Sequence, residues 1–529
     1  MRSRFKSRSV VLPCALAAMA VAAWPAWGAH PCAECHAKEV AGYASTQMAH
    51  SLGRPGREPP ANYFHEPSRT QFTIQASHGQ MIQGMERGGV TSAYPVAYQI
   101  GSGTHAFAYV IQLGDHLFQS PLGYFAGRGW GMSPGYENAK APDFFRPVTP
   151  DCLVCHAGKA RAIPQSLNSY QSPPFEAEAI TCERCHGPVD AHLRNPVPGS
   201  IVNPATLPPR ARDSICEQCH LSGEERIPNP GKQISDFRPG KDLEEVYSVY
   251  VSESSRDPAR PAALKVISQV QQLALSTCAR KSGGKLWCGT CHDPHSQPSN
   301  PQAYFREKCL SCHGSGLLKT HARPNLDCIG CHMPRRPVTD GAHTVFTDHR
   351  IARRPPPARS AEAAEETFSL VAWHEPEATL AQRNLALAEI KVGGRKESFP
   401  LVNQGFELLR DCWENFPNDP PTLKGVGDAF LTAGQGADAA IAFERAIQIE
   451  PNNAVLYLHA GLAWKQAGDP SRAIEYLEKA LQLDPLMEQP YRELGQIYSE
   501  AQNPEKANEV FGRFMRAFQK TERTKTPPR

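Results

Sequence analysis

The chain has 529 residues, of which 21% are charged and 40% hydrophobic, and it contains 48 prolines and 40 glycines. This profile is typical of a loop-rich globular chain with several domains, and it excludes a single small module and a protein with many membrane spans. The formal net charge of +3 excludes the strongly basic balance of a nucleic-acid-binding protein.

The first residues have the pattern of an export signal. Arg2, Arg4, Lys6 and Arg8 precede an apolar run over residues 10–24, and small residues follow up to Gly28. We therefore predict a signal peptide over residues 1–28 and a mature protein that is periplasmic or otherwise extracytoplasmic.

Fourteen of the 17 cysteines form seven copies of the pattern Cys-x-x-Cys-His. This spacing is typical of c-type heme attachment, because cysteines three residues apart share one side of a helical turn and the next histidine can ligate the iron. A zinc ribbon or a disulfide framework does not require a histidine after each second cysteine.

We predict seven covalent hemes c, each with its iron. The predicted heme-binding cysteines are Cys32, Cys35, Cys152, Cys155, Cys182, Cys185, Cys216, Cys219, Cys288, Cys291, Cys309, Cys312, Cys328 and Cys331. The predicted proximal iron ligands are His36, His156, His186, His220, His292, His313 and His332.

Between the first and second motifs lie more than a hundred residues without a motif. Apolar side chains alternate with polar ones in residues 71–75 and follow one another in residues 106–111, and turn residues bound both segments. This pattern predicts a β-rich insertion of hairpins at about residues 60–140. From Cys152 to His332 the motifs follow closely, with short helices and loops. We expect the hemes to form most of the core of this domain, residues 29–354.

A low-spin heme needs a sixth iron ligand from the histidines outside the motifs. We expect His78 and His116 to be solvated residues in turns. We expect His374 and His459 to lie at the surface. The role of His321, which stands between two motifs, is ambiguous from the sequence. The remaining candidates for distal ligands are His50, His65, His105, His192, His295, His343 and His349.

Several segments together resemble a known family. They are residues 287–295 (WCGTCHDPH), residues 331–334 (CHMP) with residues 347–350 (TDHR), and residues 101–105 (GSGTH). The resemblance is to exported multiheme cytochromes c related to the electron-acceptor cytochromes of hydroxylamine oxidoreductase, many of which carry tetratricopeptide repeats. It implies electron transfer through stacked, mostly bis-histidine hemes. It also favours as distal ligands His105, His192, His295, His343 and His349. One departure is Gln269, where similar proteins often carry histidine, and this leaves the coordination of one heme open.

The C-terminal third repeats with a period of 34 residues. Pro451 and Pro485 are one period apart, and small residues such as Ala439 and Ala473 recur at the same interval. This register predicts tetratricopeptide repeats over residues 378–520, with four helix hairpins in total. We predict a Pro/Ala/Glu linker over residues 355–377 and a disordered tail over residues 521–529.

The predicted fold class is therefore mainly α with a small β-rich lobe: a multiheme cytochrome c domain followed by an α-solenoid. The leading functional hypothesis is an electron carrier that docks to redox protein partners through its repeats, with no catalytic residues, no nucleic acid, and a membrane contacted only through a complex. The alternative is a multiheme oxidoreductase acting on a small inorganic nitrogen or sulfur species at one open-coordinate heme. All seven motifs end in histidine, which favours the carrier.

Overall fold

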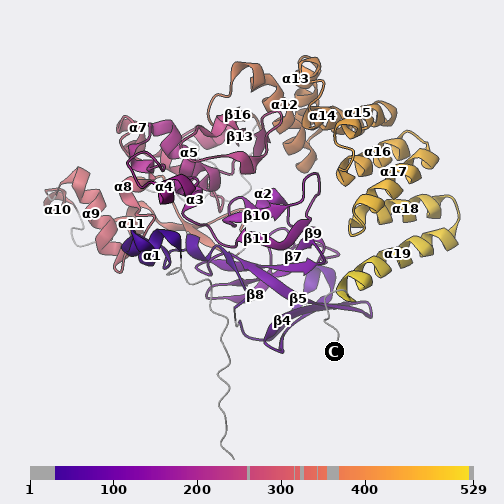
Figure 1. The fold of residues 1–529 in the computed structure, drawn as a ribbon, viewed down its shortest axis with the longest axis horizontal. Helices are drawn as coiled ribbons and strands as arrows, with labels where there is room; N and C mark the ends of the chain where they lie inside the picture. Colours follow the sequence, from indigo (N-terminus) through magenta and orange to yellow (C-terminus); the bar gives the residue numbers. More distant parts are fainter. Residues whose placement is uncertain are drawn as a thin grey trace, which may run out of the picture.

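The computed structural model describes residues 30–56, 58–258, 263–314, 316–321, 327–341, 343–353 and 368–523. The predicted signal peptide and much of the predicted linker lie outside these residues. Figure 1 shows three parts: short helices that carry the Cys-x-x-Cys-His motifs, a large β-sheet beside them, and an arc of paired helices at the C-terminal end. Within the described ranges, no helix combines the length and apolar character needed to cross a bilayer.

The motif region consists of short helices joined by loops. Its helices are α1 (Ala37–Tyr43), α2 (Pro150–Leu153), α3 (Glu183–His186), α4 (Asp190–Arg194), α5 (Pro209–His220), α6 (Gln269–Leu275), α7 (Thr277–Lys281), α8 (Cys288–Cys291), α9 (Pro301–His313), α10 (Leu317–Thr320) and α11 (Cys328–His332), together with the 3-10 turn η2 (Pro31–Glu34). Prolines and glycines with positive φ lie in the loops that separate these short helices. Gly187, for example, ends α3 with a φ of 75°, a conformation that glycine adopts without strain.

The insertion is larger than the small lobe expected from the sequence. It forms an antiparallel nine-stranded sheet with the order β2-β3-β4-β5-β6-β7-β8, in which β1 pairs with β5 and β9 pairs with β7. The strands are β1 (Leu52–Gly53), β2 (Ala61–His65), β3 (Thr70–Ser77), β4 (Gln80–Arg87), β5 (Val90–Ile100), β6 (Ala106–Leu113), β7 (His116–Phe125), β8 (Gly129–Met132) and β9 (Arg146–Pro147). The two segments with strand-like patterns are confirmed as parts of β3 and β6. In β3, Phe72 and Ile74 alternate into the core.

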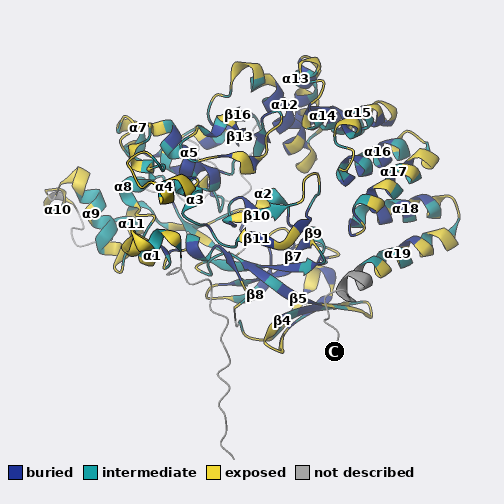
Figure 2. Ribbon diagram, in the orientation of Figure 1, coloured by how far each residue is buried: buried dark blue, intermediate teal, exposed yellow. Residues whose placement is uncertain are grey.

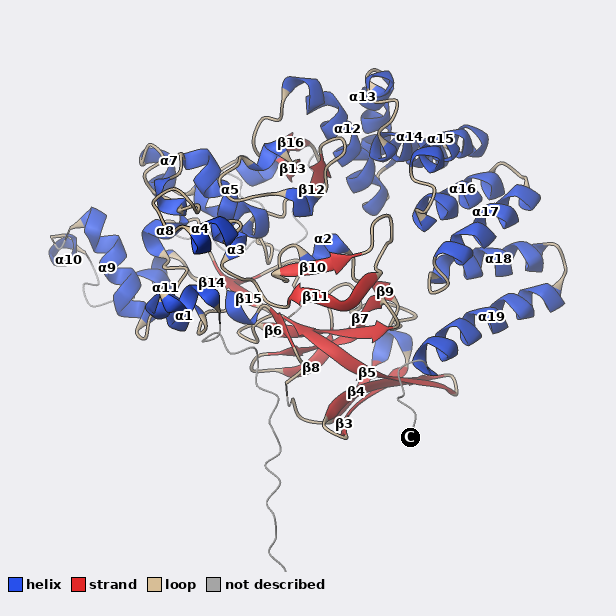
Figure 3. Ribbon diagram, viewed as in Figure 1, coloured by secondary structure: helices blue, strands red, loops and turns tan. Residues whose placement is uncertain are grey.

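Three small sheets complete the strands (Figure 3). β10 (Lys159–Ala162) pairs with β11 (Tyr170–Ala177), and β14 (Arg335–Pro337) pairs with β15 (Val345–Thr347). The third sheet joins β12 (Glu225–Pro228), β13 (Tyr247–Ser252) and β16 (Leu370–Ala372). β16 lies within residues 355–377, so this part of the predicted linker is a strand hydrogen-bonded to β13 of the motif region.

The C-terminal arc consists of four antiparallel helix hairpins, as the 34-residue register predicts. Its helices are α12 (Ala378–Arg395), α13 (Phe399–Arg410), α14 (Pro420–Thr432), α15 (Gly436–Ile449), α16 (Ala454–Gln466), α17 (Pro470–Leu483), α18 (Glu488–Glu500) and α19 (Pro504–Arg523). α19 includes the first three residues of the predicted tail. The repeated glycines are required by packing: a Cβ at Gly427 would lie 2.6 Å from the Phe443 ring, and one at Gly461 would lie 2.7 Å from Leu477.

The arc begins on the motif region. The Arg383 side chain in α12 is fully buried, pairs with Asp419 at 2.6 Å, and donates to the Pro228 carbonyl of β12 at 3.0 Å. Asn384 donates to Ser248 of β13 at 3.0 Å. These polar contacts bind the first hairpin to the three-stranded sheet.

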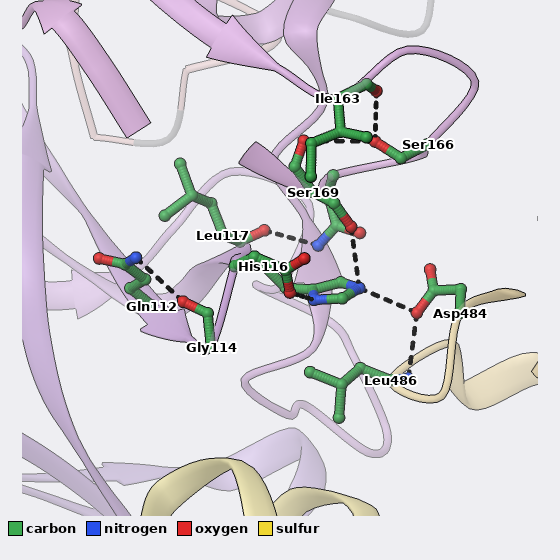
Figure 4. Close-up of polar contacts among 11 residues, drawn as sticks. Gln112, Gly114, His116, Leu117, Ile163, Ser166, Ser169, Asp484 and Leu486 are labelled. Atoms are coloured by element: carbon green, nitrogen blue, oxygen red, sulfur yellow. Dashed lines mark hydrogen bonds and ion pairs between the residues drawn. The ribbon is translucent and has the colours of Figure 1, made fainter. Parts of the chain in front are cut away.

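The arc ends on the nine-stranded sheet. His116 Nε2 lies 3.0 Å from Asp484 Oδ1 in the loop before α18 (Figure 4). Leu486 of the same loop belongs to a buried apolar cluster that also contains Phe118 and Phe144. The prediction that His116 is solvated is therefore wrong: its side chain is buried between two regions that are far apart in sequence.

Candidate functional site

Most helices that carry the motifs lack a conventional core face. η2, α3, α8, α9 and α11 bury none of their own side chains, whereas α2 and α5 bury some. Figure 2 shows the contrast with the blue inner faces of the repeat helices. A helix of a soluble protein normally buries an apolar stripe against a partner. The motif helices therefore present surface that a large apolar cofactor would cover.

Thiols of different motifs lie close to one another. The Sγ atoms of Cys32 and Cys182 lie within 4.8 Å, and Cys182 lowers the pKa of Cys32. Cys328 raises the pKa of Cys309. Cys219 lowers the pKa of Cys155, and Cys288 raises the pKa of Cys216. No disulfide joins any of the described cysteines.

Electrostatic interactions, which act over longer distances than direct contacts, link these pairs to one another. The charge of Cys185 acts on Cys216, and the charge of Cys291 acts on Cys309; both raise the pKa of the second thiol. The seven motifs therefore form one continuous cluster, although they lie in a sequence interval of about three hundred residues.

Three motif histidines face three of the predicted distal histidines. The ring centres of His36 and His192 are 6.4 Å apart, with 26° between their planes. The corresponding values are 5.8 Å and 22° for His186 and His295, and 6.2 Å and 28° for His292 and His349. A metal–nitrogen bond of about 2 Å, plus about 1.1 Å from that nitrogen to the ring centre, places two imidazole centres about 6 Å apart across one metal ion. The three pairs have this separation.

The hydrogen bonds of these rings orient Nε2 for a metal. Nδ1 lies 2.8 Å from the Val202 carbonyl in His186 and 2.9 Å from the Thr347 carbonyl in His349. A carbonyl oxygen only accepts, so Nδ1 carries the proton and Nε2 keeps its lone pair. Metal-ligating histidines almost always make this second hydrogen bond.

Two further histidines follow the same rule. His332 Nδ1 lies 3.0 Å from the Ala352 carbonyl. His192 Nδ1 lies 2.8 Å from Ser200 Oγ, whose own hydroxyl donates to Val197. In both, Nε2 again keeps its lone pair.

Desolvation by the surrounding protein atoms favours the neutral form of several of these rings, which is the form that binds metals. Desolvation, with help from neighbouring His349 and His220, lowers the pKa of His292 to about 4. Desolvation also lowers the pKa values of His156, His186 and His220.

A fourth pair includes a histidine that the sequence analysis left open. The ring of His321 lies 6.1 Å from that of His332, with the planes at 77°. Its position between the sixth and seventh motifs was the only sign in the sequence that it could ligate iron. The spacing of the motifs did not indicate which group its side chain contacts.

The other four predicted distal histidines have contacts of a different kind. His65 is a wrong assignment: it is buried within the β-lobe, and its two ring nitrogens bond to Ser68 at 2.7 Å and to the Glu137 carbonyl at 2.9 Å. His105 stacks on Phe346 at 4.2 Å.

The remaining two have other contacts. His50 Nε2 lies 2.9 Å from the Ala44 carbonyl. His343 hydrogen-bonds to Arg128 and lies against the Phe125 ring. For His50, His105 and His343, ligation stays a prediction.

The expected surface histidines also differ from expectation. His374 is only partly exposed and pairs with the buried carboxylate of Glu217 at 3.0 Å. His459 pairs with Asp428 at 2.9 Å. His78 is exposed in a turn, as expected.

Comparisons with known proteins match two separate parts of the chain. Residues 137–187, which contain the second and third motifs, match the family described as cytochrome c554 and c-prime. Residues 465–524 match the tetratricopeptide repeat family. No curated protein matches the chain.

Solved structures overlap with about a quarter of the chain. A crystal structure of MamA is 22% identical, covers 28% of this chain and 90% of its own, and has a TM-score of 0.24. An IFIT1 monomeric mutant with a capped RNA is 18% identical, covers 27% of this chain and 37% of its own, and has a TM-score of 0.22. The chain thus contains a cytochrome c-type segment and a tetratricopeptide repeat segment.

Proposed function

We propose that this protein is an exported electron carrier that relays electrons through seven covalently bound hemes c and docks to a redox partner through its repeats. The observation that supports this most directly is the continuous cluster of seven motifs, in which four motif histidines each face a second histidine at about the separation that one metal ion requires. Bound heme would supply reversible one-electron chemistry.

The residues of the chain have separate tasks in this proposal. The motif cysteines would anchor the cofactor, and the motif histidines would bind its iron. His192, His295, His349 and His321 would supply the second imidazole to four of the irons, and hydrogen bonds at Nδ1 hold His192 and His349 in orientation. Where two imidazoles hold the same iron, as these four pairs would, no place would be left there for a substrate, which favours electron transfer over bond chemistry.

Heme stoichiometry tests this proposal. Intact mass spectrometry of the denatured mature protein should show seven heme additions and a start near Ala29. Two or more motifs found consistently without heme would contradict the relay, and retention of residues 1–28 would contradict export.

The inner face of the repeats supports docking next to the cofactor cluster. A cavity of about 190 Å³ opens between the first helices of the repeats, where Lys391, Lys424 and Asp428 are among its lining residues. Lys391 also lies 3.6 Å from Glu225 of β12, and its charge acts on Asp151, the residue before Cys152 of the second motif. A partner in this cavity would lie beside the heme of the second motif.

Site-specific photocrosslinking tests the docking surface. A crosslinker at Lys424, inside the cavity, should capture a redox protein in the native host, and one at Arg472, on exposed α17, should not. Equal capture from both positions would contradict a docking site in the cavity.

A further inference from the structure

The last helix hairpin differs from the two before it in how its central apolar side chain is packed. Phe443, Leu477 and Phe511 occupy the same position in successive repeats, 34 residues apart. Phe443 and Leu477 are fully buried, because each packs on the glycine of the preceding helix. Phe511 is 65% exposed, and a Cβ at Gly495, the corresponding glycine of α18, would face open space. The position that holds the two earlier hairpins together is therefore open to solvent in the last one.

Phe511 belongs to an exposed stripe along one side of α19. Met515 lies one turn further along and is exposed, as are Asn508 and Pro504 before it. Residues three and four apart share one side of a helix, so these four side chains form a single surface, the outer stripe. Val510, on the other side of α19, is buried in the core of the repeats. Two large apolar side chains in an exposed stripe, one of them at a position that the earlier repeats bury, indicate a surface that another protein covers.

Two opposite charges beside the outer stripe are arranged to suit a second copy of the same helix. Glu505 and Arg516 are both exposed, and neither forms an ion pair with a described residue. They lie about three turns apart, so both flank the outer stripe on the same side. If two copies of α19 pack antiparallel about a twofold axis near Phe511, Glu505 of each copy lies beside Arg516 of the other. Parallel packing would instead bring like charges to the same level, which is unfavourable.

We propose that two copies of this protein associate through antiparallel packing of their α19 helices. Phe511 and Met515 of each copy pack against the outer stripe of the other, and two ion pairs between Glu505 and Arg516 flank them. A contact that uses the same patch on both copies closes on itself, so the assembly is a dimer. α19 lies at the opposite end of the arc from the cavity at Lys424 (Figure 1), so the dimer leaves that cavity to a redox partner. The dimer does not depend on the number of hemes.

Light scattering during size-exclusion chromatography of the mature protein tests the dimer. We expect the wild type to have twice the mass of one chain. Phe511→Glu should weaken self-association by about a hundredfold, because it places a charge at the centre of the contact. Ile441→Glu is the matched control: Ile441 is 55% exposed on α15, outside the proposed contact, and its replacement should leave the dimer intact. A monomeric wild type, or a dimer that Phe511→Glu leaves unchanged, would overturn the inference.

Charge exchange tests the antiparallel arrangement. Glu505→Arg alone and Arg516→Glu alone should each weaken self-association by about tenfold, because each replaces two exposed ion pairs by two contacts between like charges. An equal mixture of these two variants should form a heterodimer with the affinity of the wild type, since every basic side chain at the contact then faces an acidic one. Such restoration requires both variants to be folded, which separates loss of the contact from loss of the fold. A mixture that associates no better than either variant alone would overturn the inference.

Discussion

Two helices of similar length show how differently the two ends of this protein are stabilised. α9, with 13 residues and the sixth motif, buries none of its side chains. α15, with 14 residues, buries five side chains, among them Ala439 and Phe443. The repeat helix is held by close packing of its own apolar residues. The motif helix contains the predicted attachment residues of a cofactor and little apolar surface of its own in the core, so we expect its stability to depend on that cofactor.

Removing the cofactor should produce the largest difference between the two regions. We expect the chain made without heme attachment to lose the order of α8, α9 and α11, which bury none of their own side chains, while the repeats stay folded, because the repeat helices pack a protein core of their own. Limited proteolysis with mass spectrometry should show cleavage across residues 288–332 and a resistant fragment over residues 378–523. Equal resistance of both regions in the heme-free chain would refute the contrast.

A core truncation should affect the repeats next most strongly. Leu477 is fully buried at the position where Gly461 makes room for it, and Leu477→Ala should lower the free energy of unfolding of the repeats by about 3 kcal/mol. Ile441 is 55% exposed on α15, so Ile441→Ala serves as the control and should cost less than about 0.5 kcal/mol. Urea unfolding followed by circular dichroism measures both. Similar losses in the two variants would mean that the repeats are not held by their core.

The smallest effect should be a pH dependence where the repeats meet the β-lobe. Burial lowers the pKa of His116, but its hydrogen bond to Asp484 and the charges of Asp484 and Asp115 outweigh this and raise the pKa above its usual 6.5. The ionised contact therefore stabilises this interface fully below pH 6.5, and the stabilisation is lost as the pH rises through the raised value.

Hydrogen exchange can follow that contact. Amides of residues 484–487 should exchange faster at pH 8.5 than at pH 6, after correction for the intrinsic rate, and His116→Gln should remove the difference. Residues 451–453, in the equivalent loop one repeat earlier, provide the internal control. A pH effect of equal size in both loops would exclude His116 as its cause.

Much of the architecture could be predicted because its signals are local. The 34-residue register correctly predicted the helix hairpins, since each repeat packs mainly against its neighbours. The alternating pattern of residues 71–75 correctly predicted a strand, because every second side chain there faces the core. The size of the sheet and the short strand β16 were missed, since few residues of β16 show any pattern and its partner β13 lies far away in sequence.

By itself, the sequence determined the seven Cys-x-x-Cys-His motifs and the repeats, because both are short-range patterns whose geometry follows from a single helical turn or hairpin. Only the tertiary structure decided which side chains meet across long separations. It paired His36 with His192, added His321, enclosed His65 in the β-lobe, and turned His116 toward Asp484. The physical reason is that a histidine serves equally well as a metal ligand, a buried hydrogen-bonding group or an ion-pair partner. Which role a given histidine has depends on the side chains that surround it in the folded protein, and the packing of the chain determines those.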